Sequence, residues 1–315
     1  MAAIAAVVVV VGVTGLWGAR RIAAGTLLRE GTPVRVGLLQ GNIPQDEKWR
    51  ASEAPGILST YIALTREAAA RGAEFVVWPE SATPFVFEDD TGGAAAVRAV
   101  VRDVRVPLLF GSDQIERGPT PRIFNAAFLL GPDGATRAVY RKINLVPFGE
   151  FIPLKRLLFF VAPLVESLMD FSPGDAMVML PVGTHLVTTA ICYEVVYPEL
   201  MRQAVLGGSE LLTTITNDAW YGHSSAPYQH FALASMRAIE QGRYLVRAAN
   251  TGISGIVDPY GRVVQSSRIF EQAALVGEVR YLRSRTVYAQ VGDLVAYASA
   301  ALVGLALLAA VRRKP

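Results

Sequence analysis

Two long apolar runs lie at the two ends of the chain. Residues 1–19 and residues 294–311 carry no charged side chain, and each run is followed directly by basic residues. Each length falls within the ~17–25 residues of a membrane-spanning helix. Because a secretory signal carries its positive charges before the apolar run, we expect transmembrane helices over 1–19 and 294–311. The alternative for both runs is a buried core helix.

Between these runs, short β-rich segments alternate with amphipathic helical segments. The predicted strands cover residues 34–39, 74–78, 106–111, 186–191, 211–216 and 244–249, and predicted hairpins cover residues 124–141 and 255–265. The predicted helices cover residues 54–72, 94–104, 198–206 and 228–241. Such alternation is typical of layered α/β domains whose strands are buried. We therefore expect one α/β domain over residues 32–285.

One segment, residues 154–169, does not match this α/β pattern. It holds ten large apolar residues around Pro163, with Lys155 and Arg156 near its start. It is also too short to span a bilayer. Two interpretations stay open: a buried helix or cap over the core, and an apolar arm that touches lipid.

Composition narrows the classes of function. Apolar residues make up 52% of the 315 residues and charged residues 18%, which excludes intrinsic disorder. A net charge of +3 gives no basic surface of the kind that nucleic-acid binding needs. The single cysteine excludes an internal disulfide, and the three histidines lack metal-ligand spacing. With no glycine-rich phosphate loop either, we expect no metal and no cofactor.

Three residues could carry chemistry because of where they stand relative to the predicted strands. Cys192 directly follows the strand over 186–191, and Glu80 follows the strand over 74–78. Ligands bind at the carboxyl ends of strands in α/β folds, and a strand-to-turn junction can present a nucleophile. A thiol needs a base or a cation to become a thiolate, and Glu80 and Lys142 could supply these. Taken singly, the three could also be a buried apolar cysteine, a solvated loop acid and a surface lysine.

Longer motifs around these residues add a family resemblance. Trp78-Pro79-Glu80, Arg141-Lys142 before Pro147-Phe148-Gly149-Glu150, and Cys192-Tyr193-Glu194 resemble the Glu–Lys–Cys signature of the nitrilase superfamily. Within it, four further stretches are similar to the apolipoprotein N-acyltransferases: residues 40–49, 78–84, 216–222 and 229–252. The resemblance covers residues 34–311. It implies a nitrilase-like αββα sandwich flanked by an N-terminal and a C-terminal transmembrane helix.

The resemblance also implies a role for each matching residue. Glu80 would act as the base, Cys192 as the nucleophile and Lys142 as the electrostatic partner. Three supporting roles are implied as well. Glu150 would orient Lys142, and Tyr193 and Glu194 would shape the pocket. Trp49 would lie near the substrate entrance. Simple core packing is the alternative for Trp49. Lys142 and a backbone N–H near Tyr193 would hold the oxyanion of the reaction.

The activity implied is that of an N-acyltransferase. An acyl chain would move from a phospholipid through a Cys192 thioester, with phosphatidylethanolamine as the expected phospholipid. The acceptor would be the α-amino group of an apolipoprotein's N-terminal diacylglyceryl-cysteine. Two other functions stay open. One is a membrane-tethered amidase or nitrilase hydrolase with water as the final acceptor, and the other is an inactive lipoprotein-binding remnant.

The location implied is the cytoplasmic (inner) membrane of a bacterium, as a multi-pass protein with its catalytic domain on the periplasmic face. Basic residues 312–314 favour cytoplasmic termini, whereas Arg20, Arg21 and Arg29 favour the reverse. Long domains weaken this charge rule, so the short tail decides. The family resembled carries several spans before its nitrilase domain, and this chain carries one. We interpret the chain as a fragment, a truncated gene product or a short natural form.

Overall fold

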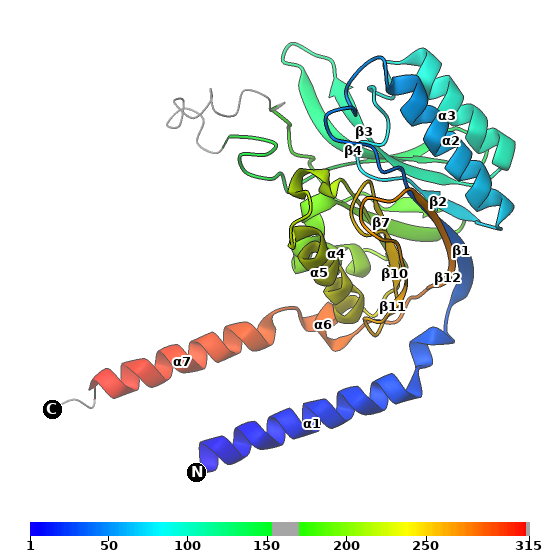
Figure 1. The fold of residues 1–315 in the computed structure, drawn as a ribbon. Helices are drawn as coiled ribbons and strands as arrows, with labels where there is room; N and C mark the ends of the chain where they lie inside the picture. Colours follow the sequence, from blue (N-terminus) through cyan, green and yellow to red (C-terminus); the bar gives the residue numbers. More distant parts are fainter. Residues whose placement is uncertain (153–169, 313–315) are drawn as a thin grey trace.

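The computed structural model describes residues 1–152 and 170–312, whose elements stack in four layers (Figure 1). Helices α2 (Ala54–Ala70) and α3 (Thr91–Val104) cover the outer face of one β-sheet. Helices α4 (Pro198–Leu206) and α5 (Ala226–Gln241) cover the outer face of a second sheet. The inner faces of the two sheets pack on each other. The predicted αββα sandwich is thereby confirmed.

The first sheet runs in the order β12-β1-β2-β3-β4-β5. Its strands are β1 (Thr32–Gln40), β2 (Phe75–Val77), β3 (Leu108–Glu116), β4 (Arg122–Leu130), β5 (Thr136–Arg141) and β12 (Ala273–Tyr281). Strands β1, β2 and β3 are parallel, β12 pairs antiparallel with β1, and β3, β4 and β5 form an antiparallel meander. Strand β5 therefore runs in the same direction as β2, and their carboxyl ends share one edge of the sheet.

The second sheet runs in the order β11-β10-β9-β8-β7-β6. Its strands are β6 (Leu180–Val182), β7 (His185–Ile191), β8 (Leu211–Thr216), β9 (Leu245–Ala249), β10 (Gly255–Val257) and β11 (Val263–Ser266). Strands β7, β8 and β9 are parallel. Short 3-10 helices, η3 (Cys192–Val196) and η4 (Asp218–Tyr221), begin just beyond the carboxyl ends of β7 and β8.

The alternation of side chains along each strand explains the layers. On β2, Val77 faces the core between the sheets and Val76 faces α2 and α3. On β8, Ile215 faces the core between the sheets and Leu212 faces α4 and α5. Each such buried side chain contributes ~1.5–3 kcal/mol of transfer free energy. Because both faces of both sheets are covered, the central strands are apolar throughout, as the sequence pattern predicts.

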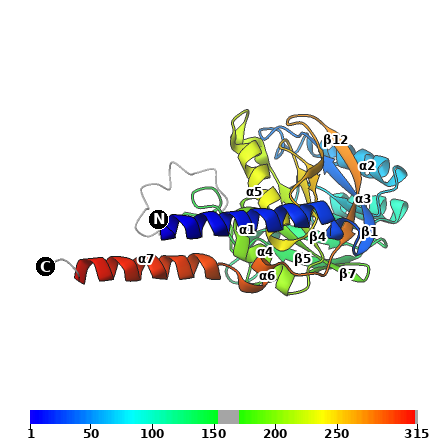
Figure 2. The same ribbon diagram turned by 90° about the horizontal axis from the view of Figure 1, so that it is seen from below.

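Helices α1 (Ala2–Ala24) and α7 (Leu294–Arg312) leave the sandwich toward the same side (Figures 1 and 2). The apolar stretches Ile4–Leu28 and Leu294–Arg312 have mean hydropathies of 1.5 and 2.3 over their most apolar 18 residues, which are not buried against the domain. Both are long and apolar enough to cross a membrane, and the crossing itself stays a prediction. Helix α1 continues past the expected end at residue 19 and stops where Gly25 adopts a φ of 57°.

Short elements join these helices to the sandwich. The 3-10 helix η1 (Thr26–Leu28) connects α1 to β1, and α6 (Val287–Val291) connects β12 to α7. The bounds of the predicted helices agree with α2, α3, α4 and α5 to within three residues at each end. Residues 154–169, for which two interpretations stay open, lie outside the residues that the structure describes.

The sequence pattern does not predict strands β6 and β12, and it ends β3 too early. Strand β12 lies at the edge of its sheet with most of its residues partly exposed, and Gly277, Glu278 and Arg280 interrupt its apolar residues. A Cβ on its Gly277 would meet Ile256 Cδ1 at 2.6 Å, so the missing side chain lets the two sheets approach. Strand β3 continues beyond the predicted 106–111 through polar residues that are mostly buried.

Candidate active site

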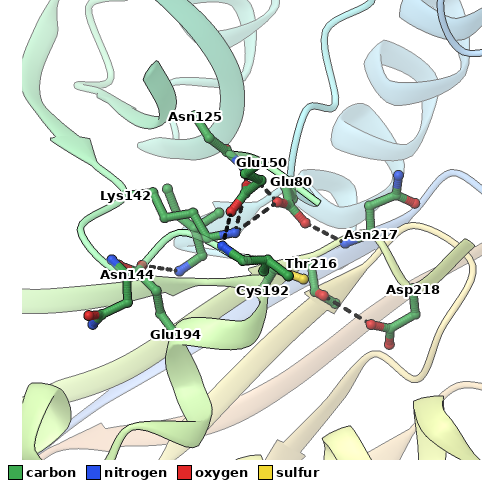
Figure 3. Close-up of polar contacts among 12 residues, drawn as sticks. Glu80, Asn125, Lys142, Asn144, Glu150, Cys192, Glu194, Thr216, Asn217 and Asp218 are labelled. Carbon is green, nitrogen blue, oxygen red and sulfur yellow. Dashed lines mark hydrogen bonds and ion pairs between the residues drawn. The ribbon is translucent and has the colours of Figure 1, made fainter. Parts of the chain in front are cut away.

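The strand directions bring the three predicted residues to one edge of the sandwich (Figure 3). Cys192 directly follows β7, Lys142 directly follows β5, and Glu80 lies three residues beyond the end of β2. Their elements belong to different sheets, so the site forms only where the two sheets pack together. All three side chains are buried. The sequence left open that Glu80 is a solvated loop acid and Lys142 a surface lysine. Their burial contradicts both alternatives.

Cys192 occupies a strained turn between β7 and η3. Its φ is 53°, in the left-handed region that residues other than glycine rarely adopt. Strained conformations of this kind cluster at functional sites, where the surrounding structure holds them. The turn ends the strand abruptly and leaves the thiol at the junction, as expected for a nucleophile.

Glu80 is held by partners on three sides. Its Oε1 accepts a 2.7 Å hydrogen bond from Asn125 Nδ2, and its Oε2 accepts a 2.8 Å bond from the main-chain N–H of Asn217. Its main-chain carbonyl accepts a 3.1 Å bond from Lys48 Nζ. These bonds hold Glu80 at the edge where the two sheets meet and fix the orientation of its carboxylate.

Lys142 is paired with two carboxylates. Its Nζ donates to Glu150 Oε1 at 2.8 Å and lies 3.8 Å from Glu80 Oε1. Glu150 Oε1 also accepts from Asn125 Nδ2 at 3.0 Å, and its Oε2 accepts from the N–H of Val146 at 2.8 Å. The geometry agrees with the orienting role that the resemblance implies for Glu150.

Burial and neighbouring charges act in opposite directions on the thiol and the ammonium. Burial and the charge of Glu80 raise the pKa of the Cys192 thiol to about 12, although Lys142 acts in the opposite direction. Burial lowers the pKa of Lys142, but Glu80, Cys192 and Glu150 together outweigh it and hold that pKa above its usual value. The resting site therefore holds a neutral thiol beside a charged lysine. A base must take the thiol proton during the reaction.

Glu194 lies beneath the nucleophile turn and is fully buried. Its Oε2 accepts from the N–H of Ile191 at 2.9 Å. Its Oε1 accepts from the N–H groups of Ile143 and Asn144 at 2.7 and 3.0 Å, and from the Tyr140 hydroxyl at 2.8 Å. Glu194 therefore ties the turn that carries Cys192 to the loop that follows Lys142, and its role in shaping the pocket stays a prediction.

Two of the predicted residues are open to solvent. Tyr193 is partly exposed, and its ring meets that of Tyr197 edge-on at 5.9 Å. Trp49 is 47% exposed, and the Lys48 ammonium lies 5.9 Å from the centre of its ring. Simple core packing does not describe a side chain this exposed. Its role at a substrate entrance stays a prediction.

Sequence reasoning did not single out Lys48, Asp113 and Asn125. All three are buried, and Asp113 on β3 pairs in register with Asn125 on β4. Burial raises the pKa of Asp113 to about 7 and lowers that of Lys48 to about 8, while each residue's charge counteracts the shift of the other. Asn125 lies in a largely apolar strand, and Asp113 continues a buried one, so buried polar residues at such positions are the signal that could have identified these two. Lys48 lies in a turn, where no such pattern applies.

A hollow of about 450 Å³ opens beside the loop that follows Lys142. Its lining residues are Ile143, Asn144, Leu145, Phe151, Asp170, Phe171, Pro173 and Tyr197. Most of these side chains are apolar, and Tyr197 connects the hollow to Tyr193 beside the nucleophile. The hollow can therefore hold an apolar group next to the candidate site. Across residues 1–152 and 170–312, no group of three or more His, Cys, Asp or Glu gathers as a metal site.

The family model for carbon–nitrogen hydrolases matches residues 35–285 of the chain. A protein of Geobacter metallireducens named apolipoprotein N-acyltransferase is 42% identical over 286 residues, which cover 90% of this chain and 55% of that protein. A protein of the same name from Gloeobacter violaceus is 40% identical over 90% of this chain and 54% of its own length. The chain thus spans about half the length of the curated relatives it matches.

Solved structures give a comparison of the fold. A mutant of an amidase of Nesterenkonia, from the nitrilase superfamily, matches with a TM-score of 0.63 at 21% identity. The match covers 86% of this chain and 98% of the amidase. At this level of identity the likeness concerns the sandwich alone.

Proposed function

Because the chain belongs to the carbon–nitrogen hydrolase family, we propose that it transfers an acyl group through a thioester on Cys192, as an apolipoprotein N-acyltransferase. The observation that carries the proposal is the 42% identity to a relative of that name over 90% of this chain. A match of that extent includes every candidate residue between Trp49 and Glu194. The strained Cys192 turn, with Glu80 and Lys142 buried beside it, supplies the parts that such chemistry needs.

In the first half-reaction, the thiol attacks the ester carbonyl of a phospholipid. Glu80 takes the thiol proton as the bond between sulfur and carbon forms, and it returns that proton to the leaving lysophospholipid oxygen as the ester bond breaks. The charge that develops on the carbonyl oxygen is held by Lys142 and the N–H of Tyr193. One donor of this kind is typically worth ~3–4 kcal/mol of the barrier.

In the second half-reaction, the α-amino group of an apolipoprotein's N-terminal cysteine attacks the thioester. An amide bond forms, the carbon–sulfur bond breaks, and Glu80 carries a proton from the amine to the departing thiolate. The energy of the original ester is retained in the thioester, so no nucleotide is required. The roles of Glu80, Lys142 and Cys192 are those that the family resemblance implies.

The apolar surroundings of the site support a lipid as the donor. Large apolar side chains stand exposed within a few positions of the buried site residues in the sequence: Trp49, Phe148, Tyr193, Trp220 and Tyr221. Exposed aromatic side chains suit the boundary between lipid and water, where an apolar ring meets a polar tip. A small soluble amide needs neither these side chains nor the helices α1 and α7.

The same considerations underlie the proposed location and partners. With α1 and α7 crossing the bacterial cytoplasmic (inner) membrane, the sandwich lies on the periplasmic face, where lipoproteins mature. Phosphatidylethanolamine is the proposed donor and an apolipoprotein the proposed acceptor. Both helices leave the same side of the sandwich (Figure 2), which suits a domain that faces a single membrane surface.

The proposal is tested by intact-mass spectrometry of the full chain in detergent after incubation with phosphatidylethanolamine. The expected result is a gain of one acyl chain, absent in Cys192→Ala and removed by a diacylated lipopeptide that carries a free α-amino group. Release of ammonia from short amides, with no acyl adduct, would favour the hydrolase. A folded protein that forms no adduct and releases no ammonia would favour the inactive lipoprotein-binding remnant.

A further inference from the structure

Helix α5 supports the nucleophile turn from behind. His230 Nε2 lies 3.1 Å from the main-chain carbonyl oxygen of Cys192, and Arg237 Nη1 donates to the carbonyl of Val196 at 2.9 Å. Seven residues, or about two helical turns, separate His230 from Arg237, so both face the same side of α5. The helix thus contacts both ends of η3. The roles implied by the family resemblance leave these two residues unassigned.

The hydrogen bonds of His230 fix where its proton lies. A carbonyl oxygen only accepts, so Nε2 must carry a proton toward Cys192. On the other side of the ring, Nδ1 lies 3.0 Å from Asp218 Oδ1 and 3.0 Å from Arg247 Nη2. The imidazole is therefore clamped between a charged pair and the nucleophile's own main chain.

The charged pair behind the ring is rigid and buried. Arg247 Nη2 donates to Asp218 Oδ2 at 2.8 Å, and the Thr216 hydroxyl donates to Asp218 Oδ1 at 3.0 Å. Both charged side chains are inaccessible to solvent. Burial raises the pKa of Asp218, but Arg247 and His230 outweigh it and hold that pKa at about 2. Asp218 thus stays ionised and holds Arg247, and the two charged groups together fix the orientation of the imidazole.

The carbonyl that His230 contacts belongs to the same peptide plane as the N–H of Tyr193. In a trans peptide the C=O and N–H groups point in opposite directions. The N–H of Tyr193 lies in the first turn of η3, where the helix itself supplies no acceptor. The contact of His230 with the Cys192 carbonyl therefore also fixes the direction of the Tyr193 N–H, which points the opposite way.

We propose that His230, oriented by the Asp218–Arg247 pair, is a positioning residue that aims the N–H of Tyr193 at the oxyanion formed when Cys192 is acylated. The inference rests on the proposed function only in requiring acyl transfer to Cys192. It holds for any acyl donor. The left-handed φ of Cys192 makes such support necessary, because the turn would otherwise relax toward a more common conformation.

The test compares two reactions of Cys192 in the full chain in detergent. The initial burst of p-nitrophenol from p-nitrophenyl butyrate reports acylation, which develops an oxyanion. Alkylation by iodoacetamide reports thiol access without one. We expect His230→Leu to slow the burst roughly 100-fold, the effect of losing one oxyanion donor, with alkylation within about threefold of wild type. His230→Gln retains a donor at similar reach and is expected to recover most of the burst rate.

The matched control is His185→Leu. His185 Nδ1 lies 2.7 Å from Glu210 Oε2, so it is also a histidine paired with a carboxylate. It begins β7, whereas Cys192 follows the end of that strand, roughly 20 Å away at ~3.3 Å per residue. Both reactions should stay near wild-type rates in this variant.

Three outcomes would overturn the inference: an unchanged burst in His230→Leu, an equal fall of both reactions, or a His230→Gln variant no faster than His230→Leu. A wild-type protein with no burst would overturn it as well. A wild-type burst combined with no acyl adduct from phosphatidylethanolamine would count against the proposed phospholipid donor. The comparison of His230 variants would then still decide the inference.

Discussion

The ammonium group of Lys142 donates a 2.8 Å hydrogen bond to Glu150 Oε1. The nearest oxygen of Glu80 stays 3.8 Å from the same ammonium. The two carboxylates therefore have different partners. Glu150 hydrogen-bonds the lysine directly, whereas Glu80 is held by hydrogen bonds from Asn125 and Asn217. This arrangement leaves the second carboxylate able to receive a proton from the thiol.

This division predicts the effect of Glu150→Gln. Without the Glu150 charge, Lys142 is expected to turn toward Glu80 and to shorten their 3.8 Å ion pair into a direct hydrogen bond. Loss of a charge-assisted hydrogen bond at the site should slow acylation by p-nitrophenyl butyrate roughly 10- to 100-fold. Stopped-flow measurement of the p-nitrophenol burst gives the rate.

The control for this prediction is Glu67→Gln, which breaks the exposed ion pair with Arg71. Exposed pairs of this kind contribute little, so its burst rate should match that of wild type. A Glu150→Gln burst at the wild-type rate would mean that the orientation of Lys142 does not depend on Glu150.

Replacement of Glu80 should change the rates of two Cys192 reactions, alkylation and acylation, in opposite directions. The Glu80 charge raises the pKa of Cys192, so Glu80→Gln lowers that pKa and increases the thiolate fraction between about pH 8 and pH 9. Alkylation by iodoacetamide should then be roughly tenfold faster for each pKa unit regained, while acylation is lost with the base. Pseudo-first-order alkylation rates across this pH range measure the effect.

Lys142→Met serves as the opposite case, because Lys142 lowers the pKa of Cys192. Its removal should raise that pKa further and slow alkylation. Glu80→Gln and Lys142→Met changing the alkylation rate in the same direction would contradict an electrostatic origin.

The residues at the strand ends were predictable because local patterns determine them. Apolar runs define the ends of β2 and β7, and parallel strands present their carboxyl ends at a common edge, so Glu80 and Cys192 follow from the sequence. The helices α4 and α5 likewise follow from their apolar periodicity. Strand β12 was not predicted in this way, because Gly277, Glu278 and Arg280 interrupt its apolar residues.

Other features depend on segments distant in the sequence. The buried state of Lys142 requires Glu80, Glu150 and the second sheet to close around it. The contact of His230 with Cys192 joins residues 38 positions apart across a helix and a turn. Neither hydrophobic periodicity nor residue spacing encodes such contacts, so only the packed structure reveals them.

Asp113 should give stability a distinct pH dependence. Its pKa is raised from an ordinary 3.8 to about 7 by burial, so between these values the folded protein keeps a proton that the unfolded chain releases. The contribution of Asp113 to stability should therefore fall as pH rises from about 4 to about 7. Asp113→Asn removes this loss and is expected to gain about 2–4 kcal/mol relative to wild type by pH 8.

Thermal unfolding of both proteins at about pH 4.5 and pH 8 measures this difference. The control is Asp103→Asn, an exposed carboxylate paired with Arg66, for which the difference should stay small at both values. An advantage of Asp113→Asn that shrinks with rising pH would contradict the raised pKa.

Trp49 should affect only donors that carry a long acyl chain. Its side chain is 47% exposed and follows Lys48, whose ammonium contacts the main chain of Glu80, so a bound lipid could cover it without altering the reacting groups. Trp49→Ala should slow acylation by phosphatidylethanolamine roughly tenfold, the scale of one lost apolar contact. The burst with p-nitrophenyl butyrate should stay within about twofold, since a four-carbon chain offers little apolar surface for Trp49 to contact. Trp17→Ala, which removes another exposed tryptophan, on α1, is the control. Equal losses with both donors would assign Trp49 to the reacting site itself, and no loss with either would remove it from the path of the lipid.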